Sequence, residues 1–320
     1  MTSANAMTTP EAPVVSMEPA HKHSGHPSGL KTIFVGPNGI RAGWRLLIFG
    51  ALVLVLLLSY LLIRNGGLKG LLEAQKHVGE ITVTPLLMIG AESIAFALVC
   101  VATLIMGRIE HRKFSAYGLP LRGALGRNFW IGAGSGFVAI SGTLLAIFLM
   151  HGFRVTGLAL HGTAILSSIF GWGLAFLLVG LFEEFLCRGY VQYTLASGIG
   201  FWPAALVISG LFGFSHYFNP RETAVGAIGA GLFGLLFCLF LRRTGNLWIA
   251  VGFHAAWDWG QTFYGVPDSG LLPYHSVFSS AFSGPQWLTG GTVGPEASVF
   301  TPIALIVVAL VFSWFHRERQ

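Results

Sequence analysis

Two adjacent glutamates interrupt an apolar stretch of the chain. Glu183 and Glu184 lie in residues 180–188 (GLFEEFLCR), and Arg188 follows Glu184 by four positions. On a helix Glu184 and Arg188 share a face and can pair, which lowers the cost of burying both charges. Glu183 is turned roughly 100° away from that face. It can therefore face a cavity and act as a general base. A salt bridge at a helix end is the plain structural alternative.

Two histidines and a further acid interrupt later apolar stretches. Phe212 and His216 stand four residues apart, and so do His254 and Asp258, so each pair lies on one helix face. A single histidine in a membrane helix is usually a packing hydrogen bonder. Here two histidines, an acid and a glutamate pair occur on separate segments, and polar groups converge because lipid excludes them. We therefore expect one shared interior site. Glu92 lacks such a partner motif and is expected to be a structural hydrogen bonder.

A carboxylate base, two imidazoles and an arginine are the groups needed to activate water for hydrolysis of a peptide bond. The sequence lacks the motifs of other intramembrane proteases: it has no HExxH zinc motif and no GxSG serine motif. An aspartyl dyad needs two buried aspartates, whereas Asp258 is accompanied only by Asp268 in a loop. The rival interpretation is a non-proteolytic membrane protein, either a proton-coupled transporter or an immunity or scaffold protein, because buried Glu/His clusters also build proton relays.

Taken in order, the Glu-Glu-x-x-x-Arg, Phe-x-x-x-His and His-x-x-x-Asp motifs resemble those of the CPBP family. This family is the CAAX prenyl protease 2-like, or abortive-infection, group of intramembrane proteases. The resemblance covers residues 165–262 and implies an endopeptidase that acts near the C-terminus of a membrane-anchored or lipidated (CAAX-type) protein. In eukaryotic and archaeal relatives the reaction removes the last three residues of a prenylated chain.

The resemblance also implies roles for the first two motifs. Glu183, together with His216, would polarise the attacking water. Glu184 would be held by Arg188 and would support the site.

For the third motif the resemblance leaves alternatives open. His254 and Asp258 would stabilise the tetrahedral oxyanion or orient the scissile carbonyl. Asp258 stands where the family usually has Asn, so it either donates a hydrogen bond in its protonated form or orients His254. The family is often described as metalloproteases, and Glu183, His216 and His254 could ligate zinc with a water in the open position. A metal-free, glutamate-activated water explains the same residues.

The composition shows what must hold these residues in place. Hydrophobic residues make up 53% of the 320 and charged residues only 10%, against roughly 25% charged residues in soluble proteins. The apolar stretches are continuous rather than alternating, which favours helices over a barrel. We predict an all-α, polytopic transmembrane helical bundle with a CAAX-protease-like core and about eight spans: 45–63, 85–106, 129–150, 163–186, 202–218, 224–241, 246–262 and 299–315.

Basic residues predict the orientation of the chain. Of the 19 Lys and Arg residues, 14 fall on one side of an eight-span arrangement and five on the other. This bias places both termini in the cytoplasm of an integral protein, most simply in the plasma membrane. Because the basic residues flank apolar runs, no nucleic-acid partner is expected. The loop 263–298 has no Lys or Arg and falls outside; its composition fits a cover over a site as well as a plain loop.

The chain divides into a polar N-terminal tail, residues 1–40, expected to be disordered, and a transmembrane domain, residues 41–320, whose protease-like core is 165–262. Gly132 with Gly136, and Ala227 with Gly231, give the spacing of small residues that permits close helix contact.

Overall fold

The eight predicted spans are all helices in the computed structural model, which describes residues 31–36, 39–76, 83–271 and 274–316. The fold is an all-α polytopic helical bundle, as predicted. The eight helices are α2 (Ala42–Arg64), α4 (Pro85–Ile109), α5 (Arg127–Leu149), α6 (Thr163–Glu184), α8 (Phe201–His216), α9 (Ala224–Thr244), α10 (Trp248–Tyr264) and α12 (Phe300–Phe315).

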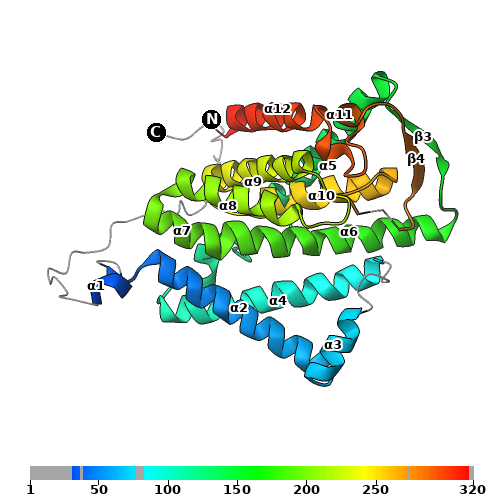
Figure 1. The fold of residues 1–320 in the computed structure, drawn as a ribbon. Helices are drawn as coiled ribbons and strands as arrows, with labels where there is room; N and C mark the ends of the chain where they lie inside the picture. The colour runs from blue at the N-terminus through cyan, green and yellow to red at the C-terminus, as the bar shows by residue number, and fades with distance from the viewer. Residues whose placement is uncertain (1–30, 37–38, 77–82, 272–273, 317–320) are drawn as a thin grey trace, which may run out of the picture.

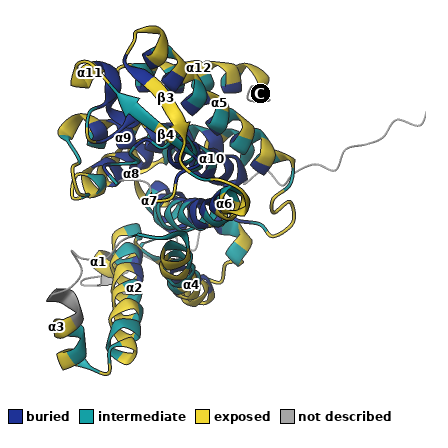
Figure 2. Ribbon diagram, turned by 90° about the vertical axis from the view of Figure 1, so that its right-hand side faces the viewer, coloured by how far each residue is buried: buried dark blue, intermediate teal, exposed yellow. Residues whose placement is uncertain are grey.

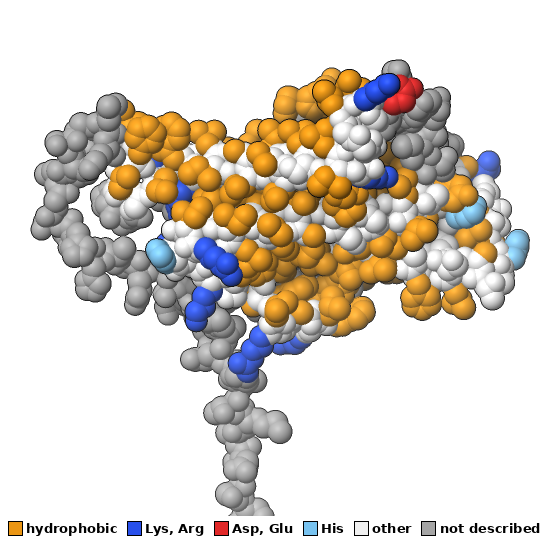
Figure 3. Space-filling view, turned by 90° about the horizontal axis from the view of Figure 1, so that it is seen from below, with side chains coloured by type: hydrophobic (Ala, Val, Ile, Leu, Met, Phe, Trp, Pro, Cys, Tyr) orange, Lys and Arg blue, Asp and Glu red, His pale blue; other side chains and the backbone are white. Residues whose placement is uncertain are grey.

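Five helices are long and apolar enough to cross a membrane by length and composition: α2, α4, α5, α9 and the continuous helix Thr163–Ile199. The helices α8 and α12 are apolar but shorter. Large apolar side chains are exposed along several of these helices, among them Leu54, Val138 and Leu310. In Figure 3 apolar side chains cover the middle of one face, and most of its Lys and Arg side chains lie toward one end.

The N-terminal half also contains short elements. These are α1 (Lys31–Phe34), the antiparallel two-residue strands β1 (Val35–Gly36) and β2 (Gly39–Ile40), α3 (Leu68–Lys76) and the 3-10 turn η2 (Phe114–Tyr117). Most of the tail predicted for residues 1–40 lies outside the described residues. Helices α2 and α3 lie at the margin of the bundle and are largely exposed (Figure 2).

Helix α10 lies at the centre of the bundle, where Figure 2 shows it buried among its neighbours. It packs against both α5 and α6. Glycines allow the close approach to α5: a Cβ on Gly132 would lie 2.1 Å from the carbonyl oxygen of Ile249, and one on Gly136 would lie 2.3 Å from that of Phe253. The predicted contact through Gly132 and Gly136 is therefore confirmed.

Ala227 and Gly231 likewise lie in the contact between α8 and α9. A Cβ on Gly213 of α8 would lie 2.3 Å from the carbonyl oxygen of Ala227 and 3.1 Å from the amide nitrogen of Gly231. This close approach fixes α8, and with it the His216 end of that helix, against α9.

Helix α6 does not end at the glutamate pair. It continues through a π-helical segment, η3 (Phe185–Val191), into α7 (Gln192–Ile199). A π-turn offsets the side-chain register by one residue, and such turns are frequent at functional sites. Glu184 is the last α-helical residue before this offset and Arg188 lies within it.

The connection between α10 and α12, residues 265–299, folds back over one end of the bundle. It contains β4 (Phe278–Phe282), α11 (Gln286–Thr289) and the turn η4 (Pro295–Ala297). Strand β4 pairs antiparallel with β3 (Phe153–Leu158), which follows α5. Figure 1 shows this two-stranded ribbon closing the end where α6 begins and α10 ends. The ribbon is a β element that the all-α prediction did not contain.

Candidate active site

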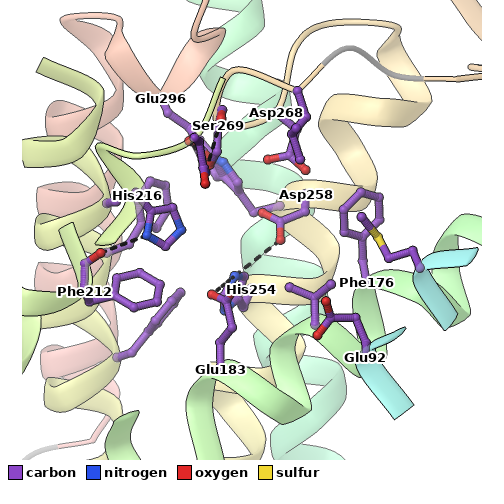
Figure 4. Close-up of a pocket in the computed structure, with 18 residues that line it drawn as sticks. Glu92, Phe176, Glu183, Phe212, His216, His254, Asp258, Asp268, Ser269 and Glu296 are labelled. Atoms are coloured by element: carbon purple, nitrogen blue, oxygen red, sulfur yellow. Dashed lines mark hydrogen bonds and ion pairs between the residues drawn. The ribbon is translucent and has the colours of Figure 1, made fainter. Parts of the chain in front are cut away.

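A pocket of about 180 Å³ lies between α4, α6, α8, α9, α10 and the α10–α12 connection (Figure 4). Four of the six residues singled out in the sequence line it: Glu183, His216, His254 and Asp258. The described residues of its polar lining also include Glu92, Asn219, Asp268, Ser269 and Glu296. Residues from segments up to about 200 positions apart in the chain thus converge on one space.

Glu184 and Arg188 are not in the pocket lining but form a buried pair beside it. Arg188 Nη1 donates to Glu184 Oε1 at 3.1 Å, and neither side chain is exposed. The Arg188 guanidinium lies 4.2 Å from the ring centroid of Phe212 and 5.5 Å from that of Phe237. These cation–π contacts stabilise the buried guanidinium in addition to its ion pair with Glu184. A Cβ at Gly234 would lie 2.5 Å from Arg188 Nη2, so α9 needs glycine there.

His254 connects this buried pair to the pocket. Its Nδ1 lies 2.9 Å from Glu184 Oε1, while its Nε2 lies 3.3 Å from Asp258 Oδ2 and 3.7 Å from Glu183 Oε2. Each ring nitrogen therefore has a carboxylate acceptor. Because Glu184 holds Nδ1, the ring presents Nε2 to the pocket, which is how a carboxylate commonly orients a ligating or catalytic imidazole.

Glu183 and His216 face the same space from different helices (Figure 4). The Glu183 side chain is 26% exposed, whereas that of Glu184 is fully buried. Among the described residues Glu183 Oε2 has no hydrogen-bond partner. His216 Nδ1 lies 2.8 Å from the carbonyl oxygen of Phe212. A carbonyl can only accept, so Nδ1 carries a hydrogen, and in the neutral ring Nε2 is the nitrogen with the free lone pair.

The α10–α12 connection supplies acidic residues that carry no motif in the sequence. Gln261 Nε2 donates to Asp268 Oδ1 at 2.9 Å and to Glu296 Oε1 at 3.1 Å, and Ser269 Oγ donates to Glu296 Oε2 at 2.6 Å. Carboxylate oxygens of Asp258, Asp268 and Glu296 lie within 4.8 Å of one another, and we call these three residues the carboxylate cluster. The loop predicted at 263–298 does cover the pocket.

Burial raises the pKa of Asp268 well above its ordinary value, and the charges of Asp258 and Glu296 act in the same direction. Burial likewise raises the pKa of Glu296, with Asp258 as the next cause. The signal that could have located these residues is compositional: the segment holds two acids and no Lys or Arg, so nothing in it could neutralise them locally.

Glu92 of α4 also lines the pocket. Among the described residues its Oε2 is buried without a hydrogen-bond partner. The sequence indicated a structural hydrogen bonder at this position, and the structure instead places the carboxyl at the edge of the space that Glu183 faces (Figure 4).

The residues considered as zinc ligands, Glu183, His216 and His254, all line the pocket and are of the right chemical type. Nδ1 is held in both histidines, by a backbone carbonyl in His216 and by Glu184 in His254, so Nε2 is the nitrogen of each that is left to bind a metal. The described residues that bring three possible ligand atoms within 4.8 Å of one another are those of the carboxylate cluster. The ligand atoms that come together are therefore carboxylate oxygens, not the expected set of one carboxylate and two imidazoles. We assign no step of the reaction to a metal.

Residues 165–260 match the family model for Rce1-like type II CAAX prenyl endopeptidases. The match spans Glu183 to Asp258 and thus all three motifs, which confirms the resemblance seen in the sequence. No curated protein matches the chain. The family is one of membrane proteases, and the long apolar helices together with this match indicate an integral membrane protein in which residues 165–260 are similar to that family.

Proposed function

We propose that the chain is an intramembrane endopeptidase of the glutamate type. It hydrolyses a peptide bond near the C-terminus of a membrane-anchored or lipidated protein, using water activated by Glu183 and His216. The observation that carries this proposal is the convergence of Glu183, His216, His254 and Asp258 on one pocket.

Glu183 is the general base of this mechanism. Its Oε2 makes no hydrogen bond among the described residues and lies 3.7 Å from Nε2 of His254, so the carboxylate can accept from a water in the pocket, while Nε2 of His216 accepts a second hydrogen bond from the same water. The water oxygen attacks the scissile carbonyl carbon as its proton passes to Glu183. The same proton is then delivered to the leaving amine as the C–N bond breaks, which returns Glu183 to its ionised form.

His254 faces the oxygen of the tetrahedral intermediate. With its Nδ1–H donated to Glu184, the imidazolium form directs Nε2–H into the pocket, where it can donate to the oxyanion. Asp258 Oδ2 lies 3.3 Å from this nitrogen and keeps the N–H oriented toward the pocket before the substrate binds. The buried Glu184–Arg188 pair acts through His254 as a positioning unit.

The substrate class is supported by the family match and by the surroundings of the pocket. Met88, Phe176 and Val179 give it an apolar side next to the catalytic groups, which suits a lipid-bearing or apolar peptide. The distribution of Lys and Arg supports an orientation with both termini in the cytoplasm, and the plasma membrane is the proposed location.

The test uses the purified full chain in lipid nanodiscs with a farnesylated CAAX-type peptide and the same peptide without the lipid. Mass spectrometry identifies the cleaved bond. Cleavage by the wild-type chain that Glu183→Ala abolishes supports the proposal. Proton flux in proteoliposomes without cleavage of either peptide would favour a transporter instead.

A further inference from the structure

Trp257 is a buried tryptophan whose indole N–H has no hydrogen-bond partner among the described residues. It is 1% exposed and lines the pocket together with Glu183 and His216. The two other buried tryptophans are satisfied: Trp172 donates to the carbonyl oxygen of Tyr274 at 2.9 Å, and Trp248 donates to that of Pro120 at 3.0 Å. A buried N–H without an acceptor is unfavourable, and native structures rarely leave one unpaired.

The Trp257 ring is held by its neighbours and cannot easily turn to find an acceptor. The ring centroid of Phe233 lies 4.7 Å away in an edge-on arrangement, and that of Phe253 lies 6.3 Å away in a parallel one. On α10, Trp257 follows His254 by three positions, so these two residues lie on the same side of the helix, and Asp258 is the next residue in the chain. The indole is therefore held beside His254, in the pocket wall that His254 and Asp258 also line.

The charge of the pocket indicates which acceptor would fit. Five carboxyl groups line it, from Glu92, Glu183, Asp258, Asp268 and Glu296, and none of its described lining residues is Lys or Arg. A free carboxylate placed here would meet these like charges, and the cation that the mechanism places in the pocket, the His254 imidazolium, is already paired with Glu184 and Asp258. A neutral carbonyl oxygen meets no such repulsion.

We propose that Trp257 is a substrate-binding residue whose indole N–H donates to a backbone carbonyl of the peptide in the pocket. The inference rests on the proposed function, because the acceptor is a carbonyl of the peptide that is cleaved. The hydrogen bond holds the peptide backbone against α10, with the scissile carbonyl facing Glu183 and His216.

The test replaces the acceptor and the donor in turn. Backbone carbonyls flanking the scissile bond of a farnesylated CAAX-type peptide are changed one at a time to thioamides, whose sulfur is a weak acceptor. Binding is measured by fluorescence anisotropy to the full chain carrying Glu183→Gln, which slows cleavage, with and without Trp257→Phe. The matched control is Trp259→Phe on the same helix, whose N–H donates to the carbonyl oxygen of Ile169 at 3.1 Å.

We expect one thioamide position to weaken binding about three- to tenfold when Trp257 is present. The same thioamide should have no effect in Trp257→Phe and its full effect in Trp259→Phe. A structural role for Trp257 would weaken the binding of all peptides alike. Equal thioamide effects with and without Trp257, or no binding of any peptide to a folded chain, would overturn the inference.

The two proposals can fail separately. If the wild-type chain cleaves neither peptide but the binding shows Trp257 coupled to one carbonyl, the proposed function fails and the inference holds. If cleavage depends on Glu183 but no carbonyl is coupled to Trp257, the inference fails alone.

Discussion

Glu184 lies outside the pocket, yet its Oε1 is 2.9 Å from Nδ1 of His254, a residue that lines it. The same oxygen accepts from Arg188 Nη1 at 3.1 Å. The carboxylate therefore joins two parts of the molecule: a fully buried ion pair at the π-turn that follows α6 and an imidazole on α10. The two adjacent glutamates thus have different surroundings: Glu183 faces the pocket, and Glu184 holds His254 from behind it.

Arg188→Ala should lower both stability and activity. The change leaves Glu184 as an uncompensated buried charge, and breaking a buried pair in this way costs about 3–5 kcal/mol. Thermal unfolding in detergent and peptide cleavage are measured on the same preparation. Arg127→Ala is the control, because Arg127 is exposed at the start of α5. Equal unfolding temperatures for the two variants would contradict the structural role of the pair.

Gly136→Ala should destabilise the bundle, whereas Gly134→Ala should not. A Cβ at Gly136 would lie 2.3 Å from the carbonyl oxygen of Phe253 and would push α5 from α10, at about 1–3 kcal/mol for overpacking. Gly134, on the same helix, has open space within 4 Å of its Cβ position, and alanine there gains up to about 1 kcal/mol of helix propensity. Comparison of the two unfolding temperatures tests the close packing of α5 against α10. A lower unfolding temperature for Gly134→Ala than for Gly136→Ala would contradict that packing.

Asp268→Asn should reduce the pH dependence of stability. The pKa of Asp268 is raised in the folded chain. The contribution of this carboxyl to folding stability is therefore fully present below its ordinary pKa of 3.8 and is lost as the pH rises through the raised pKa. The wild-type unfolding temperature should thus fall over that range, and the asparagine variant, which cannot ionise, should fall less. Parallel pH profiles for the two proteins would show that the carboxyl is not buried in this way.

Much of the fold could be predicted from local sequence. The length of each apolar run and the charges at its ends indicate a helix and its bounds, because lipid requires about 20 apolar residues in a span. The polar residues within the apolar runs also indicated which helices meet, because lipid excludes such groups. The four-residue spacing of Glu184 and Arg188 was enough to predict that they pair, because one helix determines that geometry.

The rest depends on contacts between distant parts of the chain. Asp268 and Glu296 are 28 positions apart in a polar loop, and nothing in their neighbourhood indicates that Gln261 joins them. The β3–β4 ribbon pairs residues more than 110 positions apart, so neither strand is evident from its own pattern. Glu92 stood out as an acid in an apolar stretch, but its place at the pocket depends on where α4 meets the other helices.

Chelation should leave cleavage unchanged. Among the described residues, the potential ligand atoms of Glu183, His216 and His254 do not come together as a three-ligand set. Peptide cleavage is therefore measured before and after dialysis against EDTA, followed by addition of zinc. Loss of cleavage that zinc restores would show that a metal activates the water.

The most direct test of the account is the rate of peptide cleavage by Glu183→Gln. The change keeps the shape of the side chain but removes the base, and the loss of a general base lowers the rate about 10²- to 10⁴-fold. Glu92→Gln removes a carboxyl from the same pocket and should keep most of the activity, with both variants unfolding near the wild-type temperature. A Glu183→Gln protein that cleaves the peptide at the wild-type rate would contradict the central claim that Glu183 activates the attacking water.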